Sequence, residues 1–112
     1  MDEQQDPIMT QAILQQALGR AMVGDFHIVL ELAERHEIVL TQGLVLLRWA
    51  ALHGDLNFIK YLISKGVDPR GDSVASAWAV AEGHTEVVNF LKLYEKDDLL
   101  HKVIREGIIN ED

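Results

Sequence analysis

The side chains that most often bind metals or transfer protons are five histidines, scattered along the chain. They are His27, His36, His53, His84 and His101. No two of them form H-E-x-x-H, the spacing that sets two ligands and a carboxylate on one helical face. The nearest catalytic arrangement is Asp97-Asp98 with His101, but acidic residues are common at a helix start in any case. The chain also has no cysteine, no phosphate-binding glycine loop and no G-x-S-x-G. These patterns predict no metal site, no cofactor and no enzyme activity.

The formal net charge of −8 argues against nucleic acid as a direct partner, because phosphate binding needs clustered Lys and Arg. It suits a partner protein with a basic patch, which an acidic chain would meet faster. The alternative is that the acidity only keeps the chain soluble. No stretch approaches the roughly 18 apolar residues of a membrane span, and the acidic start MDEQQDPIMT is unlike a secretory signal. We therefore expect an intracellular, cytoplasmic chain that does not contact membranes.

Three glycines recur along the chain at intervals of 30 and 29 residues. Gly24, Gly54 and Gly83 each follow small residues and precede a short polar residue, an apolar pair and a leucine. Glycine ends a helix because it accepts the left-handed conformation. Asp25 and Asp55 come directly after two of these glycines, where aspartate can cap the next helix. Each copy is therefore predicted to be a helix, a tight turn and a second, antiparallel helix.

The apolar residues within each copy recur every three to four positions, which is one face of a helix. This periodicity predicts helices over residues 8–22, 25–35, 44–52, 56–64, 74–82, 85–94 and 98–106, and no strand. One helical hairpin cannot bury its own apolar face, whereas stacked neighbours can. The sequence thus predicts an all-α stack of hairpins.

These copies resemble the ankyrin repeat, whose usual pattern is T-P-L-H-x-A-A-x-x-G-H-x-x-V-V-x-x-L-L-x-x-G-A-D. The similarity is strongest over residues 44–70, good over 74–91, which keeps the Gly83-His84 pair, and weaker over 15–35. Residues 100–107, LHKVIREG, resemble the start of a partial fourth copy. The residues in register in the strongest copy are Ala50, Ala51, Gly54, Phe58, Ile59, Leu62, Ile63, Gly66, Val67 and Asp68. The resemblance implies an ankyrin-type solenoid of about three helix-turn-helix repeats plus a partial C-terminal repeat or cap. It would be a single domain over 1–112, with repeats at 8–37, 41–70, 71–96 and 97–112.

The chain departs from the ankyrin pattern in two ways. The T-P-L-H turn is replaced by VLLR at residues 45–48 and by VASA at 74–77, so its hydrogen bonds between repeats are expected to be missing. The period is also about three residues shorter than the usual 33. We therefore expect a looser stack, in which the projecting loops are abbreviated or replaced by plain turns.

Ankyrin-type proteins typically bind partners on the concave face, through loop tips and the two residues after the paired small residues. The resemblance places Met22, Val23, Leu52, His53, Ala81 and Glu82 at the latter positions, with Arg105 and Glu106 in the partial copy. The loop-tip positions correspond to Thr41, Gln42, Leu44, Arg70, Gly71 and Ser73. Met22, Val23 and Leu52 are apolar where polar residues are more usual, and an exposed apolar strip is a candidate binding surface. The alternative is that the short loops fold over and cover this strip.

Trp49 and Trp78 occupy equivalent positions in two copies, 29 residues apart. Stacking would bring them close together on neighbouring first helices. Tryptophan fills cores, because it buries a large apolar area, and it is also favoured at binding hot spots. Both interpretations stay open from the sequence.

These expectations together favour a protein–protein interaction module, an adaptor or an inhibitor, that binds through the concave face and the inter-repeat loops. An alternative is an acidic decoy that blocks a nucleic-acid-binding surface of a partner protein. A third hypothesis is a small enzyme or metal protein, which a metal analysis that finds a stoichiometric ion would support. A further alternative is a homodimer through the C-terminal repeat face, where Ile104, Ile108 and Ile109 lie.

Overall fold

The computed structural model describes residues 7–36, 38–70 and 72–96, which form six α-helices and, over those ranges, no strand. The helices are α1 (Pro7–Met22), α2 (Phe26–Arg35), α3 (Val39–His53), α4 (Leu56–Ser64), α5 (Ser73–Ala81) and α6 (Thr85–Lys96). Six of the predicted helices are thereby confirmed, and α4 has the predicted bounds. The helix predicted at 98–106 lies outside the described residues, as does the partial fourth copy.

Helix α3 begins at Val39, earlier than the predicted residue 44. The placement of Thr41, Gln42 and Leu44 at a loop tip was therefore wrong, because all three lie inside this helix. Gln42 departs from helical geometry (φ −120°, ψ 17°) and kinks α3, yet its backbone N–H still donates to the carbonyl of Ile38 at 2.9 Å. That hydrogen bond keeps Gln42 attached to the first turn of α3, although the helix axis bends there.

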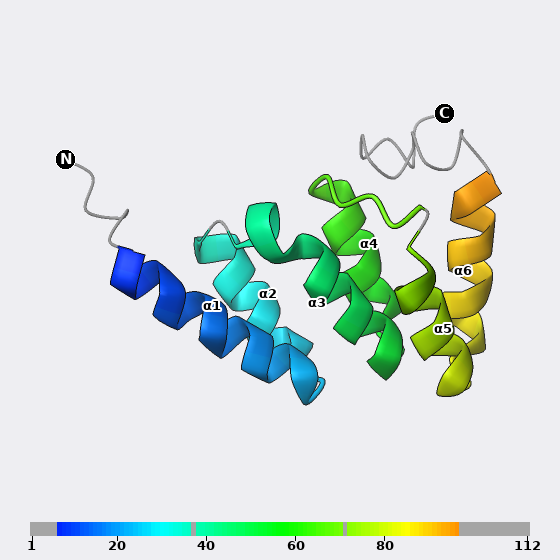
Figure 1. Ribbon diagram of the computed structural model, residues 1–112, viewed down its shortest axis with the longest axis horizontal. Coiled ribbons are helices and arrows are strands. Elements are labelled where there is room, and N and C mark those ends of the chain that lie inside the picture. Colours follow the sequence, from blue (N-terminus) through cyan, green and yellow to red (C-terminus); the bar gives the residue numbers. More distant parts are fainter. Residues whose placement is uncertain (1–6, 37, 71, 97–112) are drawn as a thin grey trace.

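The six helices form three antiparallel hairpins that follow one another across the molecule (Figure 1). The first helices, α1, α3 and α5, form one layer, and α2, α4 and α6 form the second. Helix α3 packs against α1 on one side and α5 on the other, and each first helix also packs against its own second helix. The predicted all-α solenoid of stacked hairpins is confirmed.

Each hairpin turns at a glycine in the left-handed region, with φ of 84° at Gly24, 75° at Gly54 and 74° at Gly83. At the central turn the N–H groups of Gly54 and Asp55 donate to the carbonyls of Ala51 (3.2 Å) and Ala50 (2.9 Å). These bonds satisfy carbonyls that would otherwise have no partner at the end of α3. The predicted helix stops at the three glycines are confirmed.

The two aspartates that follow glycines behave differently. The Asp55 carboxylate accepts a hydrogen bond from the backbone N–H of Phe58 at 3.0 Å, which confirms the predicted cap of α4. Asp25 makes no such bond at the start of α2, so the cap predicted there was wrong. Its carboxylate instead lies 3.8 Å from the guanidinium of Arg20 in the preceding helix.

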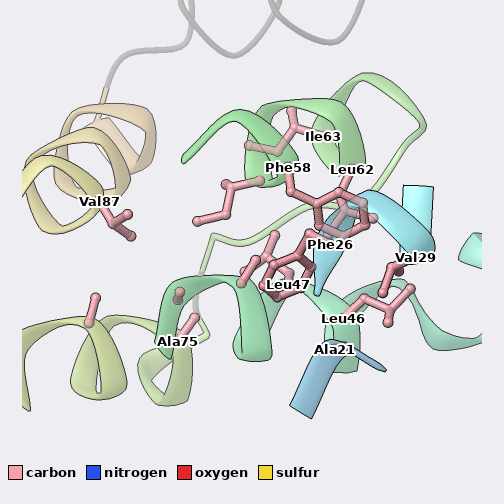
Figure 2. Packing of buried hydrophobic residues seen from close by; sticks show 14 of the residues in the cluster. Ala21, Phe26, Val29, Leu46, Leu47, Phe58, Leu62, Ile63, Ala75 and Val87 are labelled. Atoms are coloured by element: carbon pink, nitrogen blue, oxygen red, sulfur yellow. The ribbon is translucent and has the colours of Figure 1, made fainter. Parts of the chain in front are cut away.

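The core lies between the two layers and runs through all three hairpins (Figure 2). The first helices contribute small side chains, and Ala50, Ala51 and Ala79 are 0% exposed. Larger buried side chains come from the second helices, such as Ile59 and Leu62 of α4, and also from α3, which contributes Leu46 and Leu47. Among the described residues no polar or charged side chain is buried. Alanine at the contacts between first helices leaves room for close approach, as the paired small residues predict.

The two connections between hairpins differ in length. Only residues 36–38 join α2 to α3, whereas residues 65–72 join α4 to α5. The first is short, as the short repeat period predicts. In the second, Asp68 accepts hydrogen bonds from the backbone N–H and the guanidinium of Arg70, which gives the loop internal structure.

Candidate protein-binding surface

The two tryptophans meet on the layer of first helices. Trp49 lies on α3 and Trp78 on α5, with ring centroids 5.2 Å apart and ring planes inclined at 49°. Both side chains are half-buried. Each indole therefore packs against the other across the junction of the second and third hairpins and keeps part of its surface open to solvent. The expected proximity is confirmed, and the two interpretations are compatible, because one ring can serve packing and recognition.

A bidentate ion pair holds α5 against α3 one residue from Trp49. The Arg48 guanidinium donates to both carboxylate oxygens of Asp72, at 3.0 and 3.1 Å. Asp72 also accepts from the backbone N–H of Val74 at 3.2 Å and so caps α5. The hydrogen bond to Asp72, with the attraction of its charge, raises the pKa of Arg48 above its usual value. The guanidinium therefore stays charged, and its charge is balanced by the carboxylate of Asp72.

The apolar residues at the turn of the first hairpin are exposed. Met22 is 53% exposed and Val23 is 69% exposed, whereas Leu52, at the corresponding turn of the second hairpin, is half-buried. The alternative in which loops fold over this strip is therefore wrong for the first hairpin. Exposed apolar side chains of this size at one turn supply contact area that the fold itself does not use.

Two histidines hold the backbone at these turns. Nε2 of His53 lies 2.9 Å from the carbonyl oxygen of Met22, and Nε2 of His84 lies 2.9 Å from that of Leu52. Because a carbonyl only accepts hydrogen bonds, Nε2 is the donor in both cases. Each bond runs from one hairpin to the residue two positions before the glycine of the preceding hairpin.

The same two rings cover the glycines of the preceding turns. A Cβ atom built on Gly24 would lie 2.9 Å from Nδ1 of His53, and one built on Gly54 would lie 2.5 Å from Nδ1 of His84. The positions of these histidines in the sequence do not indicate this role, because His53 precedes its own glycine and His84 follows its own. The Gly83-His84 pair was the only signal in the sequence, and nothing comparable marks His53.

The remaining predicted positions form two separate groups. Ala81 and Glu82 are exposed at the turn end of α5, on the same side of the molecule as the turn that carries Met22. Ser73, also exposed, begins α5 and therefore lies at the opposite end of that helix from Glu82, and Arg70 lies in the loop before it, paired with Asp68. The structure thus does not bring the loop positions together with the turn positions. Gly71, Arg105 and Glu106 lie outside the described residues.

Metal chemistry gains no support from the geometry. Within residues 7–36, 38–70 and 72–96, no group of three or more His, Cys, Asp or Glu side chains could hold an ion. The sequence group of Asp97, Asp98 and His101 falls outside these ranges. No helix of the described residues is both long and apolar enough to cross a bilayer.

Comparison with known families agrees with this architecture of stacked helical hairpins with glycine turns. A family model described as ankyrin repeats (3 copies) matches residues 14–103. The chain belongs to the ankyrin-repeat family. Ankyrin repeats are generally protein–protein interaction modules and typically have no enzymatic activity of their own.

The ankyrin chain is also similar to part of a much larger protein, palmitoyltransferase ZDHHC17. The rat, mouse and human forms are each 38% identical to it over 64 residues. That stretch is 53% of this chain but only 10% of the relative, so the chain spans about a tenth of the length of these relatives. No solved structure matches the chain significantly.

Proposed function

We propose that this ankyrin chain binds a partner protein inside the cell through the surface formed by Met22, Val23, Leu52, Ala81 and the Trp49–Trp78 pair, which we call the turn surface. The observation that carries the proposal is the exposure of Met22 and Val23 on a turn whose backbone is held by His53. The same surface serves an adaptor or an inhibitor, since both roles begin with binding.

The turn surface is fixed before any partner arrives. The hydrogen bonds from His53 and His84 hold the carbonyls of Met22 and Leu52, and the ion pair of Arg48 with Asp72 holds α5 beside α3. A surface that is already ordered loses little conformational entropy on binding, which favours affinity. The half-exposed indoles supply the kind of rigid aromatic contact that dominates binding hot spots.

Most charges near the turn surface have a partner of opposite sign. Arg48 is paired with Asp72, Arg20 lies 3.8 Å from Asp25, and the exposed Glu82 adds one carboxylate beside Ala81. Across the described residues, loops included, acidic and basic residues nearly balance, and most of the acidic excess belongs to residues 1–6 and 97–112. The acidic decoy, which needs a contiguous acidic face, therefore gains no support from the described surface. Direct nucleic-acid binding likewise lacks a cluster of unpaired basic side chains there.

Site-specific photo-crosslinking in cells of the source organism tests the proposal. A benzoylphenylalanine placed at Ala81, on the turn surface, should yield an adduct of defined mass with a partner protein. The same probe at Asn89, exposed on α6 in the other layer, should not yield that adduct. Changing Met22 and Val23 together to serine should then reduce the Ala81 adduct by about tenfold, the loss expected for one good hot spot.

The matched control is Leu93→Ser, because Leu93 is an apolar residue of α6 that is 55% exposed away from the turn surface. It should leave the adduct unchanged. An adduct that forms equally from Asn89 would show that the partner does not bind specifically at the turn surface. An Ala81 adduct that survives the double serine change would show that Met22 and Val23 do not contribute to binding, which contradicts the proposal. A partner captured only in the presence of nucleic acid would instead favour the decoy.

A further inference from the structure

The face of α1 that points away from the core carries no charge. Its members recur at intervals of four and three residues, lie opposite the buried Ala17 and are all exposed: Ile8, Ala12, Gln15, Gly19 and Met22. Ile8 is 81% exposed and Met22 is 53% exposed. Arg20 is the one charged residue of α1, and it lies beside this face, with its guanidinium 3.8 Å from Asp25. We call these five residues the outward face of α1.

The lack of charge sets α1 apart from the helices of the second layer. Their exposed residues include Glu31 and Glu34 on α2, Lys60 on α4 and Lys92 on α6. Charged side chains keep an exposed helix in solution, whereas charge is depleted at the centre of protein–protein interfaces. Helix α1 also lies at one end of the layer of first helices (Figure 1). Its composition is that of a helix covered in an assembly.

Gly19 gives an independent indication that something approaches α1 from outside. It lies inside the helix without the left-handed φ of the turn glycines, and a Cβ atom built on it would meet nothing within 4 Å. The described fold therefore has no need of glycine here, although glycine destabilises a helix relative to alanine. A glycine on a helix surface lets another backbone come close.

We infer that the outward face of α1 binds the same face of a second copy of this chain, with the two helices antiparallel about a two-fold axis at Gln15. Intervals of four and three residues form the seam between two packed helices. Ile8 and Met22 each lie seven residues from Gln15, and the small Ala12 and Gly19 lie three and four residues from it. In this arrangement large side chains meet large ones and small meet small. The two Gln15 amides face each other, and each can donate and accept.

The absence of charge favours a second copy as the occupant. Each copy presents the same residues at a two-fold contact, so any charge on the axis would meet its own sign. An uncharged face avoids that repulsion in a chain whose net charge is −8. One helix face is smaller than a standard interface, so the dimer is of the weak class.

The dimer and the proposed partner contact can be distinguished, although Met22 belongs to both surfaces. Sedimentation of the purified chain reports the dimer, because no partner protein is present. The Ala81 adduct reports the partner, so either result can fail alone. The variants below change Gln15 and Gly19, which lie outside the turn surface.

Sedimentation equilibrium of the purified full chain, at concentrations up to about 1 mM, tests the dimer. The unmodified chain should dimerise. Gln15→Glu and Gln15→Lys should each raise Kd about tenfold or more, because like charges then meet at the axis. An equimolar mixture of the two variants should recover association, because opposite charges then meet. Asn89→Glu and Asn89→Lys make the same charge changes on α6 and should leave Kd nearly unchanged.

Gly19→Gln separates the contact from folding. Glutamine is the better helix former, so the melting temperature of the monomer, measured in dilute solution, should not fall. Kd should nevertheless rise about tenfold, because the larger side chain blocks the close approach of the second helix. A monomer at every concentration would overturn the inference. A dimer that ignores the charge at Gln15 or the side chain at Gly19 would also overturn it, because such a dimer uses another face.

Discussion

The two junctions between hairpins use one device built from different residues. At both, an imidazole covers the left-handed glycine of the preceding turn and donates to the carbonyl two residues before it. At the first junction the ring belongs to His53, which precedes its own glycine, and at the second it belongs to His84, which follows its own. At each junction the histidine ring bonds to the carbonyl two residues before the preceding glycine, and a histidine at either of two repeat positions can reach it.

The junctions differ in what surrounds this device. The second junction adds the Arg48–Asp72 ion pair and the contact of Trp49 with Trp78. Among the described residues the first junction has neither, and Gly19 occupies the position equivalent to the tryptophans. There Phe26 of α2 contacts two rings of the next hairpin, Phe58 of α4 at 5.0 Å and His53 of α3 at 6.0 Å. The first junction is therefore held mainly by packing of aromatic rings, and the second also by an ion pair between its first helices.

The largest expected loss of stability comes from adding a methyl group at a turn glycine that a histidine ring covers. Gly54→Ala should lower the free energy of unfolding by about 3 kcal/mol, because the left-handed conformation costs roughly 1–2 kcal/mol and the added Cβ, 2.5 Å from Nδ1 of His84, must displace that ring. Gly83→Ala carries the conformational cost alone, since nothing lies within 4 Å of its Cβ. Gly24→Ala, at 2.9 Å from His53, should fall between them. Urea unfolding of the three variants measures this order.

The control is the double change Gly54→Ala with His84→Ala, which removes the clash and leaves the conformational cost. The loss of stability in this double variant should be clearly smaller than the sum of the losses in the two single variants. Equal losses for Gly54→Ala and Gly83→Ala would show that the His84 ring moves aside freely and does not brace the junction.

The contribution of the Arg48–Asp72 ion pair can be measured by comparing Asp72, which caps α5 and binds Arg48, with Asp55, which caps α4. Asp55→Ala and Asp72→Ala each remove a helix cap, which costs about 1 kcal/mol. Asp72→Ala also leaves Arg48 without its bidentate partner, so it should lower the melting temperature further than Asp55→Ala does. Added salt should narrow the difference, because it screens the lost attraction.

Equal melting temperatures at every salt concentration would contradict the idea that the second junction is braced electrostatically. Asp72→Asn refines the test, since the one amide oxygen can keep the cap while the charge and one of the two hydrogen bonds from Arg48 are lost. Asp72→Asn should therefore lie closer in melting temperature to the unchanged protein than Asp72→Ala does.

Loss of a histidine hydrogen bond should lower the free energy of unfolding by less than the Gly54→Ala change does. His84→Ala should cost about 1 kcal/mol, the net worth of one protein hydrogen bond. His53→Ala should cost about half as much, because His53 is exposed and His84 is half-buried. Thermal unfolding gives both values, and amide exchange should show faster opening at the turn whose carbonyl was released. A larger loss of stability for His53→Ala than for His84→Ala would contradict this order and show that the first junction depends more on its histidine.

Most of the fold followed from sequence periodicity, and the exceptions have local causes. Gly24, Gly54 and Gly83 fixed the hairpins, because only glycine accepts positive φ without cost. The start of α3 was missed because the ankyrin resemblance places Thr41 and Gln42 at a loop tip, whereas the structure begins α3 at Val39 and crosses this stretch with a kink at Gln42. The tryptophan contact was predictable, since equivalent positions of stacked repeats become neighbours.

The interactions between repeats were not predictable in the same way. The bond from His53 to Met22 spans 31 residues and comes from a position that the repeat pattern leaves unspecified. The Arg48–Asp72 pair joins residues 24 apart whose registers follow no rule of the repeat. Side-chain partners of this kind depend on the rotation of one hairpin against the next, which the periodicity of a single chain does not fix.

The smallest expected effect concerns the turn surface and contrasts the first two turns directly. Met22→Ser and Val23→Ser should each change the free energy of unfolding by less than about 0.5 kcal/mol, because both side chains are more than half exposed. Leu52→Ser, at the turn where the side chain is half-buried, should cost about 1 kcal/mol or more. Urea unfolding distinguishes the two classes. A loss at Met22 or Val23 as large as at Leu52 would mean that these side chains serve the fold. A negligible loss, combined with loss of the Ala81 crosslink, separates recognition from stability at the same turn, because a residue that the fold does not need is then needed by a partner.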